Sequence, residues 1–157
     1  MKTCCTPSRD AAEAPAAAPA LVAADADREA RLVRLAGGAF LMGAQDGAAH
    51  PLDFEAPLRR VRLSPFRLDA VAICNRRFAR FVMATGYRTT AEREGWSFVF
   101  AGYLGDDHPP TPAVGAAPWW RRVDGACWRH PEGPASHIAG REDHPVTHVS
   151  HDDALAY

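Results

Sequence analysis

The chain has 157 residues, 47% of them hydrophobic, and a formal net charge of -1 at pH 7. This length and apolar content suit one core of ordinary domain size. The near-neutral charge provides no long-range field to attract nucleic acid or an anionic membrane, so we expect neither as a partner. No apolar run reaches the length of a membrane span, and prolines and charges interrupt any secretory signal, which indicates a cytoplasmic location. Lysine occurs only at Lys2 while arginine and alanine are frequent, a bias typical of GC-rich bacterial genomes.

Residues 1–30 are predicted to form a flexible tail. Alanine, proline and scattered acidic residues dominate 10–27, with too few large apolar side chains to offset the entropy of ordering. The tail begins with CCTPSR at 4–9, whose adjacent thiols are consistent with a modifiable peptide, a thiolate grip for Cu(I), or no role at all. Cys74 and Cys127 show neither disulfide-framework nor zinc-finger spacing, and we expect Cys127 to be a small buried hydrophobe.

Short strands are predicted from Arg31 onwards, where apolar and polar residues alternate. In RLVRLAGGAFLMG the alternation stops at two glycines (37–38) and then resumes, which is typical of a hairpin over 32–42. RRVRLSPFRLD predicts a second pair of extended segments on either side of Ser64-Pro65.

Two helices are predicted next. Asn75 is a favoured N-cap residue, and apolar residues follow it at three- and four-residue spacing until Gly86, a favoured residue just past a helix end. Thr89 and Glu92 have the spacing of a capping box, and Gly95 is the expected stop of this short second helix.

The remaining segments alternate between extended chain and loops. WSFVF (96–100) is aromatic and β-branched and predicts a buried strand, whereas the glycines and prolines of 101–118 are typical of a long loop. WWRRVDGACWRHPEGP predicts extended chain with a turn at its Asp-Gly pair (124–125), followed by irregular structure. Ser150 and Asp153 form a further capping-box pattern, and the helix that they open stops within its second turn, so we expect a truncated chain.

The segment REDHPVTHVSHDD is a candidate metal site. Its potential ligands are His144, His148, His151, Asp143 and Asp152. If 146–149 is a strand, His144 and His148 point to the same face, while His151 lies beyond the helix cap. Histidines hydrogen-bonded at a turn are the alternative that we favour, so no metal ligand is assigned.

Four tryptophans fall within a short stretch of the chain. Trp96 and Trp128 are expected in the core, where large aromatic side chains contribute most. Adjacent Trp119 and Trp120 point to opposite sides of an extended segment, so one of them is expected to line a surface or groove. A flat ring in that position suits the proline of a bound peptide.

Four longer stretches carry a resemblance to a known family. They are GGAFLMG (37–43), EAPLRRVRLSPFRLD (55–69), NRRFARFVMATGYRTTAEREGWSFVF (75–100) and APWWRRVDGACWRHPEGPASHIAGREDHPVTHVSHDDALAY (117–157). Together they closely resemble the N-terminal half of the formylglycine-generating enzymes, also called sulfatase-modifying factors. The first is shared with a wider superfamily that includes ergothioneine-type sulfoxide synthases, whereas GWSFVF, APWW and WRHPEGP resemble the formylglycine branch. Cys74 stands where this family usually has Thr or Ser, and His151 where it usually has Trp.

The resemblance implies an α+β fold, low in regular secondary structure and related to C-type lectins, of which 31–157 is the N-terminal part. It also implies an enzyme that uses O2 to oxidise the cysteine of a Cys-x-Pro-x-Arg motif in a sulfatase polypeptide to formylglycine. Two active-site cysteines hold copper in such enzymes, and calcium serves as a structural ion. The catalytic pair is expected beyond Tyr157, so we expect this chain to be inactive by itself and to bind neither ion.

What this half of the fold is expected to contribute is part of a peptide groove. The wall residues would be Trp96, Ser97, Trp119 and Trp120. Glu92 or Glu94 is the acid expected to pair with the arginine of the substrate motif.

The tail contains a copy of the substrate motif in Cys5, Pro7 and Arg9. It is therefore expected to be modified in cis or in trans, or to occupy the groove as a tethered competitor. Transfer of Cu(I) from Cys4 and Cys5 to the active site is a further possibility. The other functions left open are a non-catalytic, lectin-like peptide- or protein-binding module and an unstable product without activity.

Overall fold

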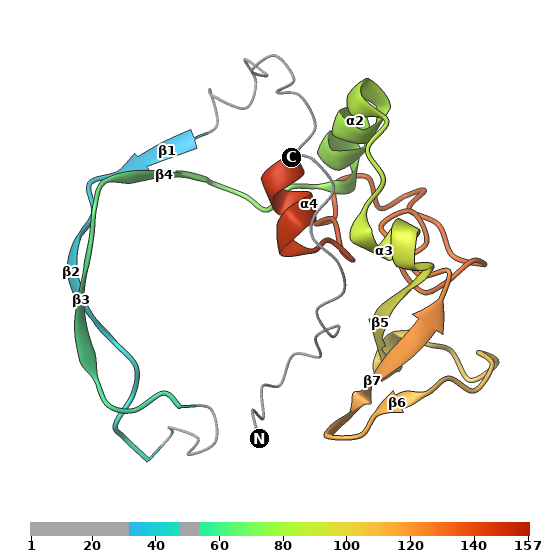
Figure 1. Cartoon of the computed structure of the whole chain (residues 1–157), viewed down its shortest axis with the longest axis horizontal. Coiled ribbons are helices and arrows are strands. Elements are labelled where there is room, and N and C mark those ends of the chain that lie inside the picture. The colour runs from blue at the N-terminus through green and yellow to red at the C-terminus, as the bar shows by residue number, and fades with distance from the viewer. Residues whose placement is uncertain (1–31, 48–53) are drawn as a thin grey trace. The chain divides into compact units, whose positions relative to one another are not determined.

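The computed structural model describes residues 32–47 and 54–157. These residues form two compact units, one that ends at Val71 and one that spans Ala72–Tyr157, and each is described by itself (Figure 1). The predicted tail, with its CCTPSR stretch, lies outside the described residues. The single domain predicted over 31–157 stays a prediction. In the described ranges, no helix combines the length and the apolar character that crossing a membrane requires.

The first unit is a ladder of four short strands. They are β1 (Leu32–Leu35), β2 (Gly38–Met42), β3 (Arg59–Leu63) and β4 (Phe66–Asp69). The predicted hairpin over 32–42 is wrong, because β1 pairs with β4 and β2 pairs with β3, both antiparallel. Gly37 and Gly38 interrupt one side of the ladder without reversing it. A Cβ at Gly37, whose φ is 75°, would collide with the carbonyl oxygen of Leu63, so glycine permits this close backbone approach.

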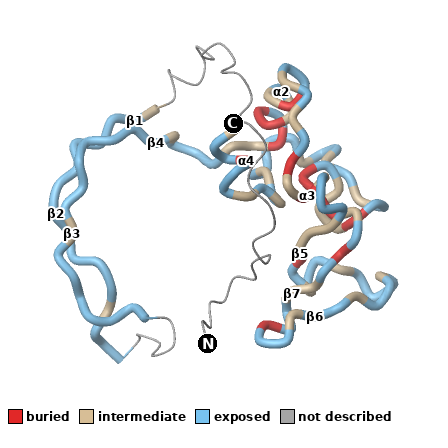
Figure 2. Tube along the Cα trace, viewed as in Figure 1, coloured by how far each residue is buried: buried red, intermediate tan, exposed pale blue. Residues whose placement is uncertain are grey.

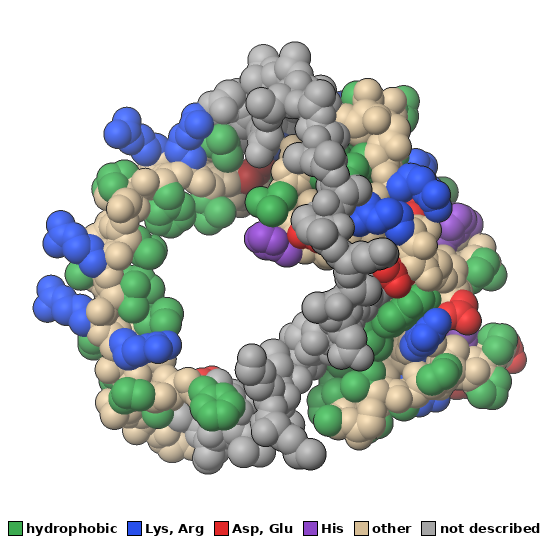
Figure 3. Space-filling view, in the orientation of Figure 1, with side chains coloured by type: hydrophobic (Ala, Val, Ile, Leu, Met, Phe, Trp, Pro, Cys, Tyr) green, Lys and Arg blue, Asp and Glu red, His purple; other side chains and the backbone are tan. Residues whose placement is uncertain are grey.

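The strand register gives each pair of strands a mainly apolar face and a mainly charged face. Cross-strand pairs such as Leu35 with Phe66 and Phe40 with Val61 share the apolar face, while Arg34 lies opposite Arg67 on the other. Every large apolar side chain from Phe40 to Met42 is at least 40% exposed. Figure 2 shows the pale blue of exposed residues along most of the ladder, and in Figure 3 most green apolar side chains lie on one side of it and most blue side chains on the other.

The second unit has a packed core beneath α2 (Asn75–Thr85). Phe78 and Val82 face inward from this helix and meet Trp128, which is completely buried. The Phe78 and Trp128 ring centroids are 5.3 Å apart in an edge-to-face arrangement, the geometry that aromatic pairs favour. The prediction that Trp128 belongs to the core is therefore confirmed.

The start of α2 differs from its prediction, whereas its end does not. Cys74 occupies the N-cap position without a side-chain hydrogen bond, so the prediction that Asn75 caps the helix is wrong. Asn75 is instead the first helical residue, and its buried amide donates to the carbonyl oxygen of Arg141 at 2.9 Å. Gly86 ends the helix in the left-handed conformation, as predicted, and its N–H bonds to the Val82 oxygen.

Two capped helix starts are joined by one buried carboxylate. The predicted capping boxes are confirmed for α3 (Thr90–Glu94) and α4 (His151–Ala156). The Asp153 side chain, which is fully buried, accepts hydrogen bonds from the N–H of Ser150, the N–H of Thr90 and the hydroxyl of Tyr87. Burial raises the pKa of Tyr87, and the bond to Asp153 adds to the rise while Arg93 opposes it.

A three-stranded antiparallel sheet completes the second unit. Its strands are β5 (Trp96–Phe100), β7 (Ala117–Asp124) and β6 (Ala113–Val114), in the order β5-β7-β6. The strand predicted at β5 is confirmed, but only Val99 in it is fully buried, because β5 lies at the sheet edge. The predicted loop after β5 contains the short helix η2 (Ala101–Tyr103) and β6. The architecture is α+β with little regular structure, as predicted.

Candidate functional site

The second unit contains a cavity of about 1090 Å³. Its lining comes from six places in the sequence: the start of α2, β5, η2, β7, the loop around Pro131, and the segment 141–149. Apolar and aromatic groups dominate this lining, with a small number of polar side chains among them. A concave, mostly apolar cavity with a few convergent polar groups is the usual form of a ligand site.

Three aromatic side chains form one wall of the cavity. Phe100 on β5 lies directly opposite Trp120 on β7 in the strand register, and their ring centroids are 6.1 Å apart. Tyr103, in η2, meets Phe100 edge to face at 5.8 Å. Phe100 and Tyr103 are both exposed at the cavity mouth, which leaves ring surface for a ligand.

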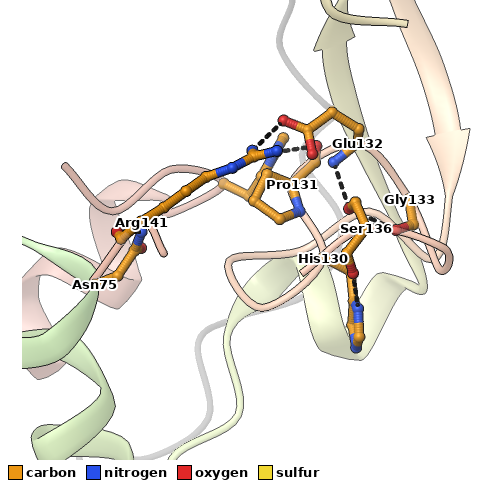
Figure 4. Close-up of polar contacts among 8 residues, drawn as sticks. Asn75, His130, Pro131, Glu132, Gly133, Ser136 and Arg141 are labelled. Carbon is orange, nitrogen blue, oxygen red and sulfur yellow. Dashed lines mark hydrogen bonds and ion pairs between the residues drawn. The ribbon is translucent and has the colours of Figure 1, made fainter. Parts of the chain in front are cut away.

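The loop that carries WRHPEGP is held by its own polar groups (Figure 4). His130 Nδ1 donates to the Ser136 carbonyl oxygen at 2.6 Å, and the Ser136 hydroxyl donates to the Gly133 carbonyl oxygen at 2.7 Å. Gly133 has a φ of 105° and no room for a side chain, since a Cβ there would lie 2.9 Å from a methyl group of Val123. The loop conformation thus depends on residues inside the motif that the sequence singled out.

An ion pair and a hydrogen bond, both made by Arg141, connect this loop to α2. Arg141 donates to the Glu132 carboxylate at 2.6 Å, and the Arg141 carbonyl accepts the Asn75 amide (Figure 4). All three residues line the cavity. Charge-assisted bonds of this length are strong, and this one places a carboxylate and a guanidinium on the cavity wall.

A histidine connects the loop to β5. His148 Nε2 lies 2.8 Å from the carbonyl oxygen of Pro131, and Nδ1 lies 2.9 Å from the hydroxyl of Ser97. The backbone of His148 has a φ of 57°, in the left-handed region that residues other than glycine seldom adopt. Ser97, Pro131 and His148 all line the cavity.

Of the six side chains predicted to line a groove, Ser97 and Trp120 line this cavity. Trp119, its neighbour, is 45% exposed on the other side of β7, so the two tryptophans do point apart. Trp96 does not belong to the lining. It is half-buried, in contact with Phe98 at 5.0 Å, and the Arg122 guanidinium lies 4.5 Å above its ring.

The two predicted acids lie outside the cavity lining. Glu92 accepts bonds from the backbone N–H and the hydroxyl of Thr89, and its other oxygen lies 3.7 Å from Arg129. Glu94 is exposed at the end of α3. Glu92 therefore serves the helix cap, and the carboxylate on the cavity wall is that of Glu132.

The histidine-rich segment does not assemble a metal site in the described residues. Across 32–47 and 54–157, no group of three or more His, Cys, Asp or Glu side chains is placed to hold a metal ion. No strand forms over 146–149, and His148 is bonded at a turn, as the favoured alternative predicted. Cys127 is buried, as expected, and neither Cys74 nor Cys127 lines the cavity. Among the described residues, the cavity wall thus offers copper no pair of thiolates.

Several lining residues escaped the sequence analysis. Glu132, Arg141 and Tyr103 fall in segments without periodicity, so although WRHPEGP and the histidine-rich segment were noticed, nothing singled out these side chains within them. Phe100 was detectable, because a strand ending in an aromatic residue beside a tryptophan pair suggests a cross-strand ring contact. His148 was noticed, but as a potential metal ligand rather than as a partner of Ser97.

Comparison with known proteins shows which protein family the chain that forms this cavity resembles. Residues 18–157 match the sulfatase-modifying factor enzyme 1-like domain. The formylglycine-generating enzyme of Thermomonospora curvata is 54% identical over 130 residues, which cover 80% of this chain and 42% of that protein. Its counterpart in Streptomyces coelicolor is 50% identical over 151 residues, 94% of this chain and 48% of the relative. The cattle enzyme is 49% identical over 129 residues, 81% of this chain and 34% of its own length.

The chain thus spans between a third and a half of the length of these relatives. The match to the family, over residues 18–157, includes every residue that lines the cavity. The chain belongs to the family of sulfatase-modifying factor enzyme 1-like domains.

Proposed function

We propose that this chain carries the peptide-binding part of a formylglycine-generating enzyme. The substrate would be a Cys-x-Pro-x-Arg segment of a sulfatase polypeptide. The observation that carries the proposal is the aromatic-walled cavity, in a family whose relatives are named for this reaction. The cavity is large enough for several side chains of an extended peptide.

The cavity offers a counterpart for each fixed side chain after the cysteine. The rings of Trp120 and Phe100 suit the flat apolar face of proline. Glu132 is the carboxylate available to the substrate arginine, since a carboxylate accepts up to about four hydrogen bonds and Arg141 leaves some of them open. We therefore propose Glu132, instead of Glu92, as the partner of the substrate arginine, because the Glu92 carboxylate is hydrogen-bonded in the cap of α3.

The net reaction converts the thiol-bearing methylene group of a cysteine to an aldehyde. Two electrons leave the cysteine side chain, its sulfur departs as hydrogen sulfide, and O2 accepts four electrons. Two external thiols supply the other two electrons and two protons and become a disulfide, so that the net products are one aldehyde, one hydrogen sulfide and one water. Copper would supply the one-electron chemistry that O2 requires. Because neither Cys74 nor Cys127, the thiols of the described residues, lines the cavity, we propose that these described residues bind peptide without oxidising it.

The experiment is a titration of the chain with a peptide that contains Cys-Thr-Pro-Ser-Arg, followed by tryptophan fluorescence. We expect saturable binding, weakened by replacing Trp120 with Leu because the proline would lose its aromatic wall. Trp119→Leu is the matched control, since this neighbouring side chain lies outside the cavity lining. Peptides with Pro→Ala or Arg→Ala are expected to bind more weakly, and equal binding of all three peptides would contradict the proposal.

A parallel assay tests the predicted lack of oxidation. The chain, the peptide, copper and a thiol reductant are incubated under air, and the peptide mass is followed. We expect the cysteine to remain unconverted. Formation of the aldehyde would show that thiols of this chain catalyse the reaction.

A non-catalytic binding module is the second candidate. The observation in its favour is that the described residues lining the cavity all lie within Ala72–Tyr157 and include no thiol. The native protein distinguishes the candidates, because an enzyme isolated from its own source converts the peptide and a module only binds it.

A further inference from the structure

We propose that His148 is a positioning residue, which makes the hydroxyl of Ser97 a hydrogen-bond acceptor for the bound peptide. This inference rests on the proposed function, because it concerns peptide binding in the same cavity. It goes beyond that function by assigning a role to a histidine in the turn before α4 and a direction to one hydrogen bond.

The argument begins at the carbonyl of Pro131. A carbonyl oxygen only accepts, so the 2.8 Å contact requires a proton on His148 Nε2. A neutral imidazole has one N–H, and Nδ1 must therefore be the acceptor. The partner of Nδ1 at 2.9 Å is the Ser97 hydroxyl, which must donate its only proton to the ring.

The consequence lies on the cavity side of Ser97. With its proton held by His148, the oxygen presents only lone pairs to the cavity, so it accepts from a backbone N–H or guanidinium of the peptide. A serine without this partner rotates freely and offers a proton or a lone pair with similar ease. His148 thus selects a donor on the ligand and lowers the entropy cost of binding it.

The position of His148 is maintained from both sides. The Pro131 carbonyl belongs to the loop that the Glu132–Arg141 ion pair and the His130 contact hold in place. The backbone of His148 itself adopts a φ of 57°. Side chains held in seldom-populated backbone conformations are concentrated at functional sites, where the surrounding structure compensates for the strain.

Protonation of His148 reverses the arrangement. Both ring nitrogens then donate, Ser97 accepts from Nδ1, and its proton turns toward the cavity, where it meets a peptide donor unfavourably. Peptide affinity is thus expected to fall as the pH falls through the range in which histidine gains its proton. The other titratable or charged groups on the cavity wall are Tyr103, Glu132, Arg141 and His144.

The first measurement is the protonation state of His148 in the chain without peptide. Nitrogen NMR of histidine-labelled protein, assigned with a His148 variant, distinguishes the two neutral forms. We expect a proton on Nε2 and an accepting Nδ1. A proton on Nδ1 of the neutral ring would overturn the inference, whatever the peptide does.

The second measurement is the affinity for the Cys-Thr-Pro-Ser-Arg peptide. Ser97→Ala and His148→Gly are each expected to weaken binding about three- to tenfold, the effect of one hydrogen bond, and glycine tolerates the backbone conformation at 148. Because His148 acts through Ser97, the double variant should bind no more weakly than the singles. Multiplied losses, or no effect of His148→Gly, would contradict the role of His148.

The pH profile separates this role from simple structural support. The peptide affinity of the wild type should fall about three- to tenfold on acidification, and we call this drop the pH step. Ser97→Ala should lack the pH step. His148→Asn favours the same backbone region and places an amide oxygen near Nδ1, so it should recover part of the affinity without the step. His144→Gln should keep the step, and its disappearance in that variant would assign the titration to His144.

His151→Asn is the control for basal affinity, because His151 is exposed on α4 and does not line the cavity. Failure of the proposed function and failure of this inference give different results. If wild type binds no peptide at any pH, the proposed function is wrong. If it binds, but with an affinity that is indifferent to His148, only the inference is wrong.

Discussion

Both units of the chain contain large apolar side chains, but the two units bury them to different extents. In the second unit, Phe78, Val82 and Trp128 surround one another and are almost completely buried. In the ladder of the first unit, the apolar face that includes Phe40 and Leu68 remains largely exposed across the described residues. The difference shows that an alternating pattern specifies which face of a strand is apolar, but not what covers it. Burial requires a further element packed on that face, and the described residues of the first unit provide only the two pairs of strands.

The largest expected effect tests the core of the second unit. Trp128→Ala should reduce the free energy of unfolding by about 3–5 kcal/mol, because it removes a fully buried ring from the face of Phe78. Urea unfolding monitored by circular dichroism measures the loss. Trp119→Ala is the matched control and should cost far less, since 45% of that side chain is exposed. If both variants lowered the free energy of unfolding equally, the assignment of Trp128 to the core and of Trp119 to the surface would be contradicted.

The next effect concerns the carboxylate that joins α3 to α4. Asp153→Asn should reduce the free energy of unfolding by about 2–3 kcal/mol, because an amide supplies one acceptor where two oxygens accept from Ser150, Thr90 and Tyr87. Tyr87→Phe removes a single bond and should cost about 1 kcal/mol. Asp152→Asn is the exposed control in the first turn of α4. If Asp153→Asn left the free energy of unfolding unchanged, the two helix starts would not be coupled through this side chain.

A smaller effect is the response of the second unit to alkaline pH. The pKa of Tyr87 is raised above 10.0, the value in the unfolded chain. As the pH rises above 10.0, Tyr87 loses its proton in the unfolded chain before it does so in the folded chain. The free energy of unfolding should therefore fall as the pH rises from 10.0 through the higher pKa of the folded state. Ultraviolet titration of wild type and Tyr87→Phe isolates this phenol among the three tyrosines. A pKa at or below the ordinary value would refute the assignment.

The smallest effect is expected in the ladder. Leu68→Ser exchanges an apolar side chain that is 57% exposed, so the free energy of unfolding should change by only about 0.5 kcal/mol. The same urea experiment measures it, with Arg67→Ser on the opposite face as the control. A loss near that of Trp128→Ala would show that the apolar face is covered in solution and would abolish the contrast between the units.

Local signals in the sequence predicted much of the secondary structure. The capping boxes at Thr89 and Ser150, and the helix end at Gly86, are confirmed because each depends on residues within three or four positions. The hairpin at Gly37-Gly38 was wrong because a pair of glycines permits a turn but equally permits a close approach to another strand. Pairing with 59–69 is a long-range choice that no local window contains.

The candidate site divides in the same way. The sequence by itself determined the family, through WRHPEGP and its neighbouring motifs, and it marked Ser97 and Trp120, which line the cavity. It also predicted Glu92 as an acid for the substrate arginine; this stays a prediction, and the structure shows the Glu92 carboxylate in the cap of α3. Only the tertiary structure decided that Glu132, Arg141 and His148 share one cavity wall with Ser97. Hydrogen bonds between residues 51 positions apart, such as that of His148 to Ser97, depend on how the whole unit packs, and local propensity carries no information about that distance.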